Sequence, residues 1–212
     1  MKRTIYILAS AAILLAACQQ KIEFLHDLTL SSSTVNMPAE ECWHVIAVYS
    51  NDGWEASFSE PVDWASLDVV AGEGGIGRIR LGCVENRGLK RSVKVIVRSG
   101  AAADTLNVNQ YSGVAVPEFS FAKSSVEISG EPARVSVGLV TNLGQDVDRS
   151  VISVTDAEGN PVDWVSDVTV TPEAVIFTVK KALETRRAVL TLTLSDSDGK
   201  TSQTSLDIIQ NI

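Results

Sequence analysis

The sequence predicts an all-β protein that consists of two tandem β-sandwich domains. First, apolar and polar residues alternate with a period of two, as in 78–83 and 133–139, which is typical of strands that are buried on one face. Second, turn-forming residues separate such segments, as in Asn51-Asp52-Gly53. Third, similar segments occur in the same order in both halves of the chain.

An internal repeat divides the chain into two units. Residues 61–66 and 106–110 recur 100 positions later as 161–166 and 206–210, and 33–37 recurs 91 positions later as 124–128. Three blocks in one order predict two copies of a unit of about 90 residues. We therefore expect one domain over 26–113 and a second over 117–212, with a short linker that limits their freedom.

Short strands account for each unit. Segments 92–98 and 189–194 also alternate, and no segment after the N-terminal apolar run has the 3.6-residue period of an amphipathic helix. About seven short strands in a unit of this size are typical of an immunoglobulin-like β-sandwich. The shift between the copies changes from 91 to 100 after Asn51, so the second copy carries nine extra residues around 145–160.

The first 17 residues have the features of a secretory signal peptide. Lys2 and Arg3 precede an apolar run that is shorter than the about 20 residues needed to span a bilayer. The run ends in Leu-Ala-Ala-Cys, which resembles the lipobox of bacterial lipoproteins, where the cysteine is lipidated and becomes the new N-terminus. We expect a signal peptide over 1–17, lipidation of Cys18 and a tether over 18–25. The alternative is an ordinary signal peptide in which Cys18 has no special role.

The acidic charge balance constrains the partners and the location. The 212 residues carry 18 basic and 26 acidic side chains, a net charge of −8, which disfavours nucleic-acid binding. Cleavage before Cys18 would leave 195 residues with a net charge of −10, so we expect the lipid to hold the protein to the membrane. No aspartate follows Cys18 to indicate retention in the inner membrane. This favours the outer membrane, with the protein at the cell surface or on the periplasmic face.

Few residues are available for catalysis or for binding a cofactor. The chain has two histidines and three cysteines, which leaves little material for a metal site. His26 lies at the end of the tether and His44 in the apolar phase of a strand, and neither accompanies a glycine-flanked serine. A small sandwich has no deep cleft for a pair of catalytic carboxylates. We therefore expect no metal, no other cofactor and no enzymatic activity.

Motifs in both units resemble a known family. The first unit reads Ser50-Asn51-x-x-Trp54, Asp63-Trp64-Ala65-Ser66, a glycine-rich turn over 72–77, Asn86, Arg91-Ser92-Val93 and Val108-x-Gln110. The second reads Asn142, Asp163-Trp164-Val165-Ser166, Arg187-Ala188-Val189 and Ile208-x-Gln210. In this order the motifs resemble the BACON domain, an immunoglobulin-like module of surface and secreted proteins of Bacteroidetes. The second unit lacks the tryptophan after its asparagine and the glycine-rich turn, so it resembles a divergent copy.

The resemblance implies a role in recognition at the cell envelope. BACON domains are proposed to bind carbohydrate or mucin and often occur in glycan-degrading systems. The resemblance therefore implies glycan or mucin binding, or an accessory role with a protein partner in an outer-membrane complex for glycan uptake. The same module also serves as a spacer that holds another module away from the membrane. The alternative is a structural spacer or an adhesion-type protein-interaction module that binds no glycan.

The aromatic residues fall into two groups. Trp64 and Trp164 recur with their neighbours and Trp54 fits the BACON pattern, so we expect these three side chains to be structural. Trp43 and Tyr49 lie on the strand face opposite the apolar phase, where an exposed aromatic pair could stack on sugar rings. The alternative is that the tether or the other domain covers this face.

Two cysteines remain in the first unit. Cys42 and Cys83 both fall in the inward phase of their strands, which could face each other across the sandwich. Export would permit a disulfide between them, and buried free thiols are the alternative. Alanine and valine take these places in the second unit, so the fold does not require the bond.

Overall fold

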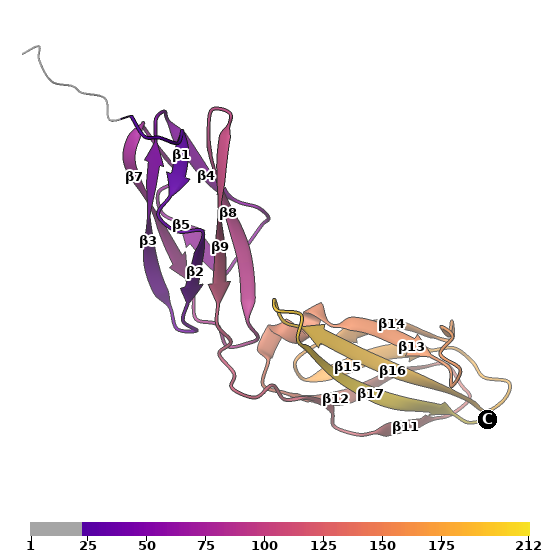
Figure 1. Ribbon diagram of the computed structural model, residues 1–212. Helices are drawn as coiled ribbons and strands as arrows, with labels where there is room; N and C mark the ends of the chain where they lie inside the picture. The colour runs from indigo at the N-terminus through magenta and orange to yellow at the C-terminus, as the bar shows by residue number, and fades with distance from the viewer. Residues whose placement is uncertain (1–22) are drawn as a thin grey trace, which may run out of the picture.

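The computed structural model describes residues 23–212, which consist mainly of β-strands. It confirms the predicted all-β, immunoglobulin-like fold class, because the strands form two sandwiches that follow one another along the chain (Figure 1). The predicted signal peptide over 1–17, the predicted lipidation site Cys18 and most of the predicted tether over 18–25 lie outside the described residues. Within residues 23–212, no helix is long and apolar enough to span a membrane.

The first sandwich packs a four-stranded sheet against a five-stranded sheet. The smaller sheet has the order β1 (Leu28–Leu30), β3 (Cys42–Ser50), β7 (Gly75–Cys83) and β5 (Ala65–Leu67). The larger has the order β2 (Thr34–Met37), β9 (Ala102–Gln110), β8 (Arg91–Ser99), β4 (Trp54–Phe58) and β6 (Ala71–Gly72). Val48, Leu81, Val95 and Leu106 are fully buried in the core cluster of this unit. This core forms because alternate side chains of each strand are apolar and point to the same face.

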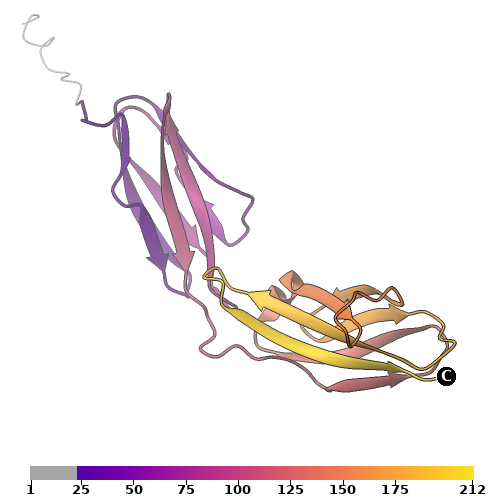
Figure 2. The same cartoon turned by 45° about the vertical axis from the view of Figure 1, so that its right-hand side comes forward.

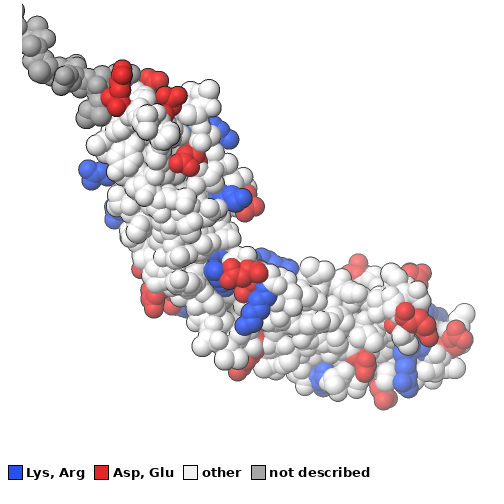
Figure 3. All heavy atoms as spheres, viewed as in Figure 1, with Lys and Arg blue, Asp and Glu red and all other residues white. Residues whose placement is uncertain are grey.

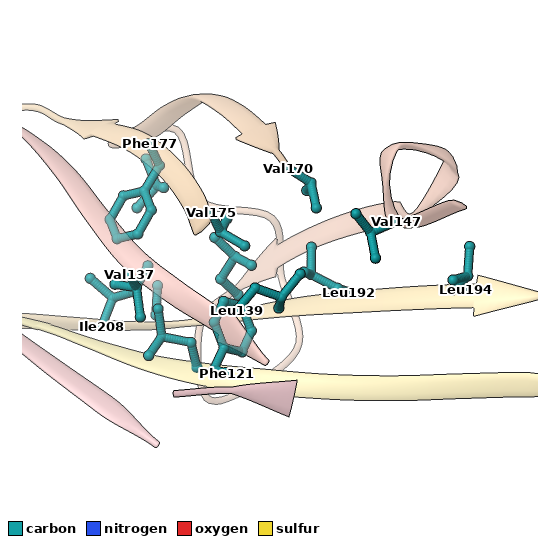
Figure 4. Close-up of a cluster of buried hydrophobic side chains, with 14 of the residues drawn as sticks. Phe121, Val137, Leu139, Val147, Val170, Val175, Phe177, Leu192, Leu194 and Ile208 are labelled. Carbon is teal, nitrogen blue, oxygen red and sulfur yellow. The ribbon is translucent and has the colours of Figure 1, made fainter. Parts of the chain in front are cut away.

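The second sandwich packs two four-stranded sheets. One has the order β10 (Phe119–Phe121), β12 (Ala133–Thr141), β15 (Ala174–Val179) and β14 (Val165–Val170). The other has the order β11 (Ser125–Ile128), β17 (Thr201–Gln210), β16 (Arg186–Ser195) and β13 (Val151–Thr155). Figure 4 shows the core between them, where Phe177, Val137 and Ile208 gather near one end and Val147 and Leu194 lie near the other. Val147 belongs to a 3-10 helix, η1 (Gly144–Arg149), and is fully buried.

The sequence repeat corresponds to a repeat of strand topology. β2 pairs in parallel with β9, with Val35 opposite Val108, and β11 pairs in parallel with β17, with Val126 opposite Ile208. The first strand of each unit pairs with the other sheet instead. β1 pairs with the long strand β3 in the first unit, and β10 pairs with the long strand β12 in the second. The two copies therefore have the same path through their first strands.

Asn51 and Asn142, which mark the repeat in the sequence, have the same structural role. The side-chain oxygen of Asn51 accepts a hydrogen bond from the backbone N–H of Phe24 at 2.7 Å, and that of Asn142 accepts one from Glu118 at 2.9 Å. Each side-chain amide also donates to a backbone carbonyl of the same entering segment, at Phe24 or Val116. Each asparagine thus fixes the chain where it enters its sandwich.

The two sandwiches lie end to end with a bend between them, and they meet at the loop 84–90 of the first and η1 of the second (Figures 1 and 2). Leu89 of this loop is only 5% exposed because it packs into the core cluster of the second sandwich. Its backbone N–H donates to Asp146 Oδ2 at 2.7 Å. Gly88 lies so close to the Asp146 carboxylate that a Cβ atom would collide with it. We call this contact the junction.

Charged side chains surround the junction, and Figure 3 shows both signs gathered where the sandwiches meet. Lys90 Nζ pairs with Asp198 of the β16–β17 turn at 2.7 Å, and the backbone N–H of Ser197 in that turn donates to the Lys90 carbonyl at 3.2 Å. Arg149 pairs with Asp146 at 2.9 Å. These contacts hold the loop 84–90 on two elements of the second sandwich.

The buried Asn86 sets the shape of this loop within the first sandwich. Its amide donates to the carbonyls of Leu89 and Tyr111 at 2.8 Å, and its oxygen accepts from the N–H of Gly88 at 3.1 Å. The element on the other side of the junction, η1, lies almost wholly within the extra segment predicted around 145–160. The insertion that distinguishes the second copy therefore builds the surface that receives the first.

Candidate functional site

The outer face of β3 and β7 carries an exposed aromatic side chain. Trp43 is 49% exposed, and it lies opposite Gly82 in the strand register. Its ring lies over this glycine, where a Cβ atom would stand 2.7 Å from the indole. The guanidinium of Arg80 stacks over the indole at 4.3 Å from the ring centroid. We call Trp43, Val45, Arg80 and their neighbours on this face the Trp43 face.

Polar and apolar groups flank the indole on this face. Arg80 pairs with Asp68 at 3.5 Å, and both side chains are about half exposed. The hydroxyl of Ser66, in β5, lies near the Gly82 position against which the Trp43 ring packs. Val45 is 55% exposed and lies opposite Arg80 in the strand register. The face therefore offers one flat apolar surface with hydrogen-bond donors and acceptors beside it.

Tyr49 is not part of this surface. It lies on the same side of β3, but six residues along the strand from Trp43, which is about 20 Å at the rise of a β-strand. It is half-buried, and its ring meets Phe24 of the tether edge-on, with 5.7 Å between the centroids. The two aromatic residues therefore do not form a pair, and the end of the tether covers part of the face at Tyr49.

The face of β12 that corresponds to the Trp43 face carries no aromatic platform. The residue that matches Trp43 is Arg134, which lies opposite Thr178 of β15. On β3 the burial alternates only from Ile46 onward, and His44, expected on the inward side, is exposed. The two copies thus differ at the surface where the first one exposes its indole.

Trp64 and Trp164 belong to a cluster that recurs at the same place in each sandwich. The Arg91 guanidinium lies 4.7 Å from the Trp64 ring centroid, and that of Arg186 lies 4.4 Å from the Trp164 ring centroid. The Nε of each arginine donates to a fully buried glutamine, Gln110 at 2.8 Å or Gln210 at 2.9 Å. Trp164 is 7% exposed and Trp64 is half-buried.

This cluster closes the end of each sandwich by hydrogen bonds to backbone carbonyls. Gln110 donates to the carbonyls of Val84 and Ala39, and Gln210 to those of Lys180 and Ser129. The sequence motifs set Arg187 against Arg91, and the strand register corrects this. Arg91 lies opposite Gln110 in the first sandwich, and Arg186 lies opposite Gln210 in the second. The loop before β16 is one residue shorter than the loop before β8, which hides this offset in the sequence.

Trp54 is buried for a different reason. It is 4% exposed, and its indole packs against the backbone of Gly72 and Gly77, where a Cβ atom would stand 2.7 Å from the ring. These two glycines belong to the glycine-rich segment that the sequence places over 72–77. The segment therefore makes room for a core tryptophan.

The two cysteines of the first unit lie in one sheet and not across the sandwich from each other. β3 and β7 are neighbours, and Cys42 lies directly opposite Cys83 in their register. The prediction of facing sheets was wrong because the phase of a strand does not reveal which strand pairs with it. Both thiols are free. Burial raises the pKa of the Cys83 thiol to about 11, and burial also raises the pKa of Cys42, which is half-buried.

A groove of about 590 Å³ lies between the two sandwiches. Trp64, Arg91, Lys90 and Asp146 are among the residues that line it. Its basic groups already have partners within the protein, since Lys90 pairs with Asp198 and Arg91 donates to Gln110. Within residues 23–212, no cluster of three or more histidine, cysteine or acidic side chains could hold a metal ion. We therefore regard the groove as part of the junction.

Known proteins are only distantly similar to this chain. No family model matches the sequence, and no curated protein matches it. A Bacteroides ovatus GH5 xyloglucanase, solved in complex with a heptasaccharide, is similar over 49% of this chain and 22% of its own, with 20% identity and a TM-score of 0.37. Tandem immunoglobulin domains of titin are similar over 87% of this chain and 96% of theirs, with 10% identity and a TM-score of 0.35.

A glycoside hydrolase family 107 endo-fucoidan hydrolase is similar over 91% of this chain, with 11% identity and a TM-score of 0.36. The chain spans less than a third of the length of either of these two hydrolases. At such identities and TM-scores the likenesses carry no argument about this chain.

Proposed function

We propose that the chain is a non-catalytic, lipid-anchored protein of the outer membrane that binds carbohydrate on the Trp43 face. The observation that carries the proposal is the half-exposed indole of Trp43 on the outer face of β3, with Arg80 and Asp68 beside it. The C–H face of a sugar ring is apolar and suits an indole, while its hydroxyl groups suit charged donors and acceptors. Resemblance to the BACON domain supports the same ligand class. The anchor is the lipid on Cys18.

The shape of the face favours an extended chain of sugars over a single small molecule. The Trp43 face is an open strand surface, and Val45 continues it beside Arg80 along β3. A polysaccharide or a mucin glycan can lie across several strands and contact the indole with one of its residues. The Arg80 guanidinium would then either donate to the sugar at the edge of the ring or give up its place over the indole.

The proposal is tested with the soluble fragment 19–212 on insoluble polysaccharides, mucin and a glycan array. We expect retention of the wild-type fragment, a loss of at least about tenfold in affinity for Trp43→Ala, and a smaller loss for Trp43→Phe, which keeps a ring. Tyr49→Ala serves as the matched aromatic control, because Tyr49 lies away from the indole against Phe24. Equal binding by wild type and Trp43→Ala, or no retention on any glycan, would refute the proposal.

The junction favours a second candidate function, a spacer that holds a partner at a fixed distance from the membrane. A spacer needs domains that do not swing freely, and Leu89 buried in the second core provides such a restraint. The same pull-down distinguishes the two functions. Capture of a defined outer-membrane protein partner, together with no retention on glycans, would support the spacer.

A further inference from the structure

Cys42 and Cys83 form a directly opposed pair at the ends of two neighbouring strands. Cys42 is the first residue of β3 and Cys83 the last residue of β7. The backbone N–H of Ser31 donates to the carbonyl of Ala47, so the backbone groups of the odd-numbered residues of β3 point toward β1. The backbone groups of the even-numbered residues, Cys42 included, therefore form their hydrogen bonds with β7.

The β7 side of the pair has the matching orientation. The backbone N–H of Asp68 donates to the carbonyl of Arg80, so the backbone groups of the even-numbered residues of β7 point toward β5. The backbone groups of the odd-numbered residues, Cys83 included, therefore form their hydrogen bonds with β3. Cys42 and Cys83 therefore occupy a hydrogen-bonded site of the antiparallel ladder, where the Cα atoms are about 5.5 Å apart. A disulfide requires a Cα separation of about 4.4–6.8 Å, which this pair meets without a change in register. It also requires a Cβ separation of about 3.5–4.5 Å, whereas directly opposed Cβ atoms are about 4.5–5.5 Å apart, so the two strand ends must move together by on the order of 1 Å when the bond forms.

We propose that Cys42 and Cys83 are an oxidation site at which a disulfide oxidant joins β3 to β7 by a cross-strand disulfide. The oxidant class is a small-molecule or protein disulfide. In the cell the bond depends on the export that the proposed function includes, because disulfides persist in oxidising compartments. The two thiols are the only cysteines among residues 23–212.

The different surroundings of the two thiols set the order of the reaction. Cys42 is half-buried and Cys83 is 4% exposed, so the oxidant reaches Cys42 first. The Cys42 thiolate attacks the disulfide of the oxidant, forms a mixed disulfide and expels one thiolate. Cys83 then loses its proton, its sulfur attacks the Cys42 sulfur, and the second thiolate of the oxidant leaves. Two protein thiols are oxidised, the oxidant is reduced to two thiols, and the two protons end on those thiols.

The bond would reinforce the end of the sandwich that forms the junction. Cys83 directly precedes the loop 84–90, and Cys42 follows the β2–β3 turn. That turn already holds the loop, because the Ala39 carbonyl accepts hydrogen bonds from the Asn86 N–H and from Gln110 Nε2. A disulfide would add a covalent link between the same two segments.

The second sandwich supplies the control variants. Ala133 lies opposite Val179 in β12 and β15, at the position that corresponds to Cys42 and Cys83. The fold therefore accepts alanine and valine at this pair, and Cys42→Ala and Cys83→Val are expected to fold. Each variant leaves one thiol of the pair in place.

The test is oxidation of the folded fragment 19–212 with glutathione disulfide, followed by thiol counting in denaturant and by intact mass. For the wild type we expect no free thiol, a mass lower by two hydrogen atoms and no retained glutathione. We also expect a midpoint of thermal unfolding that is higher by on the order of 10 °C and falls again with dithiothreitol. Cys83→Val is expected to stop at one glutathione adduct on Cys42, and Cys42→Ala to react far more slowly because Cys83 is buried.

A wild-type product with glutathione on Cys42 and a free Cys83, a disulfide-linked dimer, or an absence of any reaction would each overturn the proposal. The glycan pull-down reports on the proposed function separately, so failure of one leaves the other standing. Protein that oxidises in vitro but carries two free thiols when isolated from the cell envelope would contradict the cellular part of the proposal.

Discussion

Replacement of Leu89 by alanine is the sharpest test of the junction. The leucine is 5% exposed, and its side chain belongs to a loop of the first sandwich but packs in the core cluster of the second, together with Leu143 and Val147. Truncation of a buried leucine to alanine typically costs about 2–5 kcal/mol, from lost transfer free energy and from the cavity that remains. We take about 3 kcal/mol, because the site lies at the edge of a core where the loop can partly relax.

Leu89→Ala should destabilise the sandwich that receives the side chain and not the one that contributes it. Because Leu89 fills the second core, Leu89→Ala should lower the unfolding midpoint of the second sandwich by on the order of 10 °C. The first sandwich, which contributes the residue, should change little. Calorimetry of the fragment 19–212 measures the midpoints, and hydrogen exchange of amides in β16 and in β8 assigns each transition to its sandwich.

Leu183 provides the matched control for this substitution. It lies in the corresponding loop of the second sandwich, between β15 and β16, but it is 86% exposed. Leu183→Ala should therefore change stability by less than about 0.5 kcal/mol. Small-angle scattering should show a broader distribution of shapes for Leu89→Ala only. Equal shifts for the two variants, or loss of exchange protection in β8 alone, would refute the reasoning.

Three further predictions follow from other contacts. Gly82→Ala places a Cβ atom within 2.7 Å of the Trp43 ring, so we expect a displaced indole, seen as changed tryptophan fluorescence, and weaker glycan retention with an unchanged unfolding midpoint. Gln110→Ala leaves Arg91 Nε without its acceptor and removes one of the two side-chain donors to the Val84 carbonyl, the other being Arg91 Nη2. The loss should destabilise the first sandwich by about 1–3 kcal/mol in urea unfolding. Hydrogen bonds from the backbone N–H and the side-chain amide of Asn160 hold the pKa of the Asp156 carboxyl below its ordinary value. The turn 156–160 should therefore be fully ordered above that ordinary value and should lose its order as the pH falls through the lowered pKa. The chemical shift of the Asp156 carboxyl carbon measures this titration. An Asp156 that titrates at its ordinary pKa would contradict this.

Local periodicity predicted the fold class well, because alternation of apolar residues determines which face of a strand is buried. It located Ile46 and Val48 in the core and Trp43 on the opposite side of β3. It failed at His44, which is exposed although it lies in the same phase of the strand as the buried Ile46. The phase of a strand also says nothing about its neighbours, so the adjacency of Cys42 and Cys83 appears only with the strand order.

The contacts that the sequence did not predict depend on register and on loops. The Trp64–Arg91 and Trp164–Arg186 stacks join residues that are far apart in the sequence, and the loop lengths of the two copies differ by one residue before the arginine. Leu89 stands in a loop, where no periodicity distinguishes a docking side chain from a solvated one. Only the extra segment around 145–160 signalled that the second copy has a feature of its own.

The differences between the copies show that their order in the chain is fixed by structure. The first copy has Asn86, Gly88 and Leu89 in its docking loop. The second copy has Ala182 at the place of Asn86, because the backbone N–H of Asn86 donates to the Ala39 carbonyl and that of Ala182 donates to the corresponding Gly130 carbonyl. The second copy has η1 to receive a docking loop, whereas the first has only the short turn after Asn51 at that end. Each copy therefore carries the residues for its own side of one junction. Exchange of the two copies would leave Leu89 without a core to enter and η1 without a loop to hold.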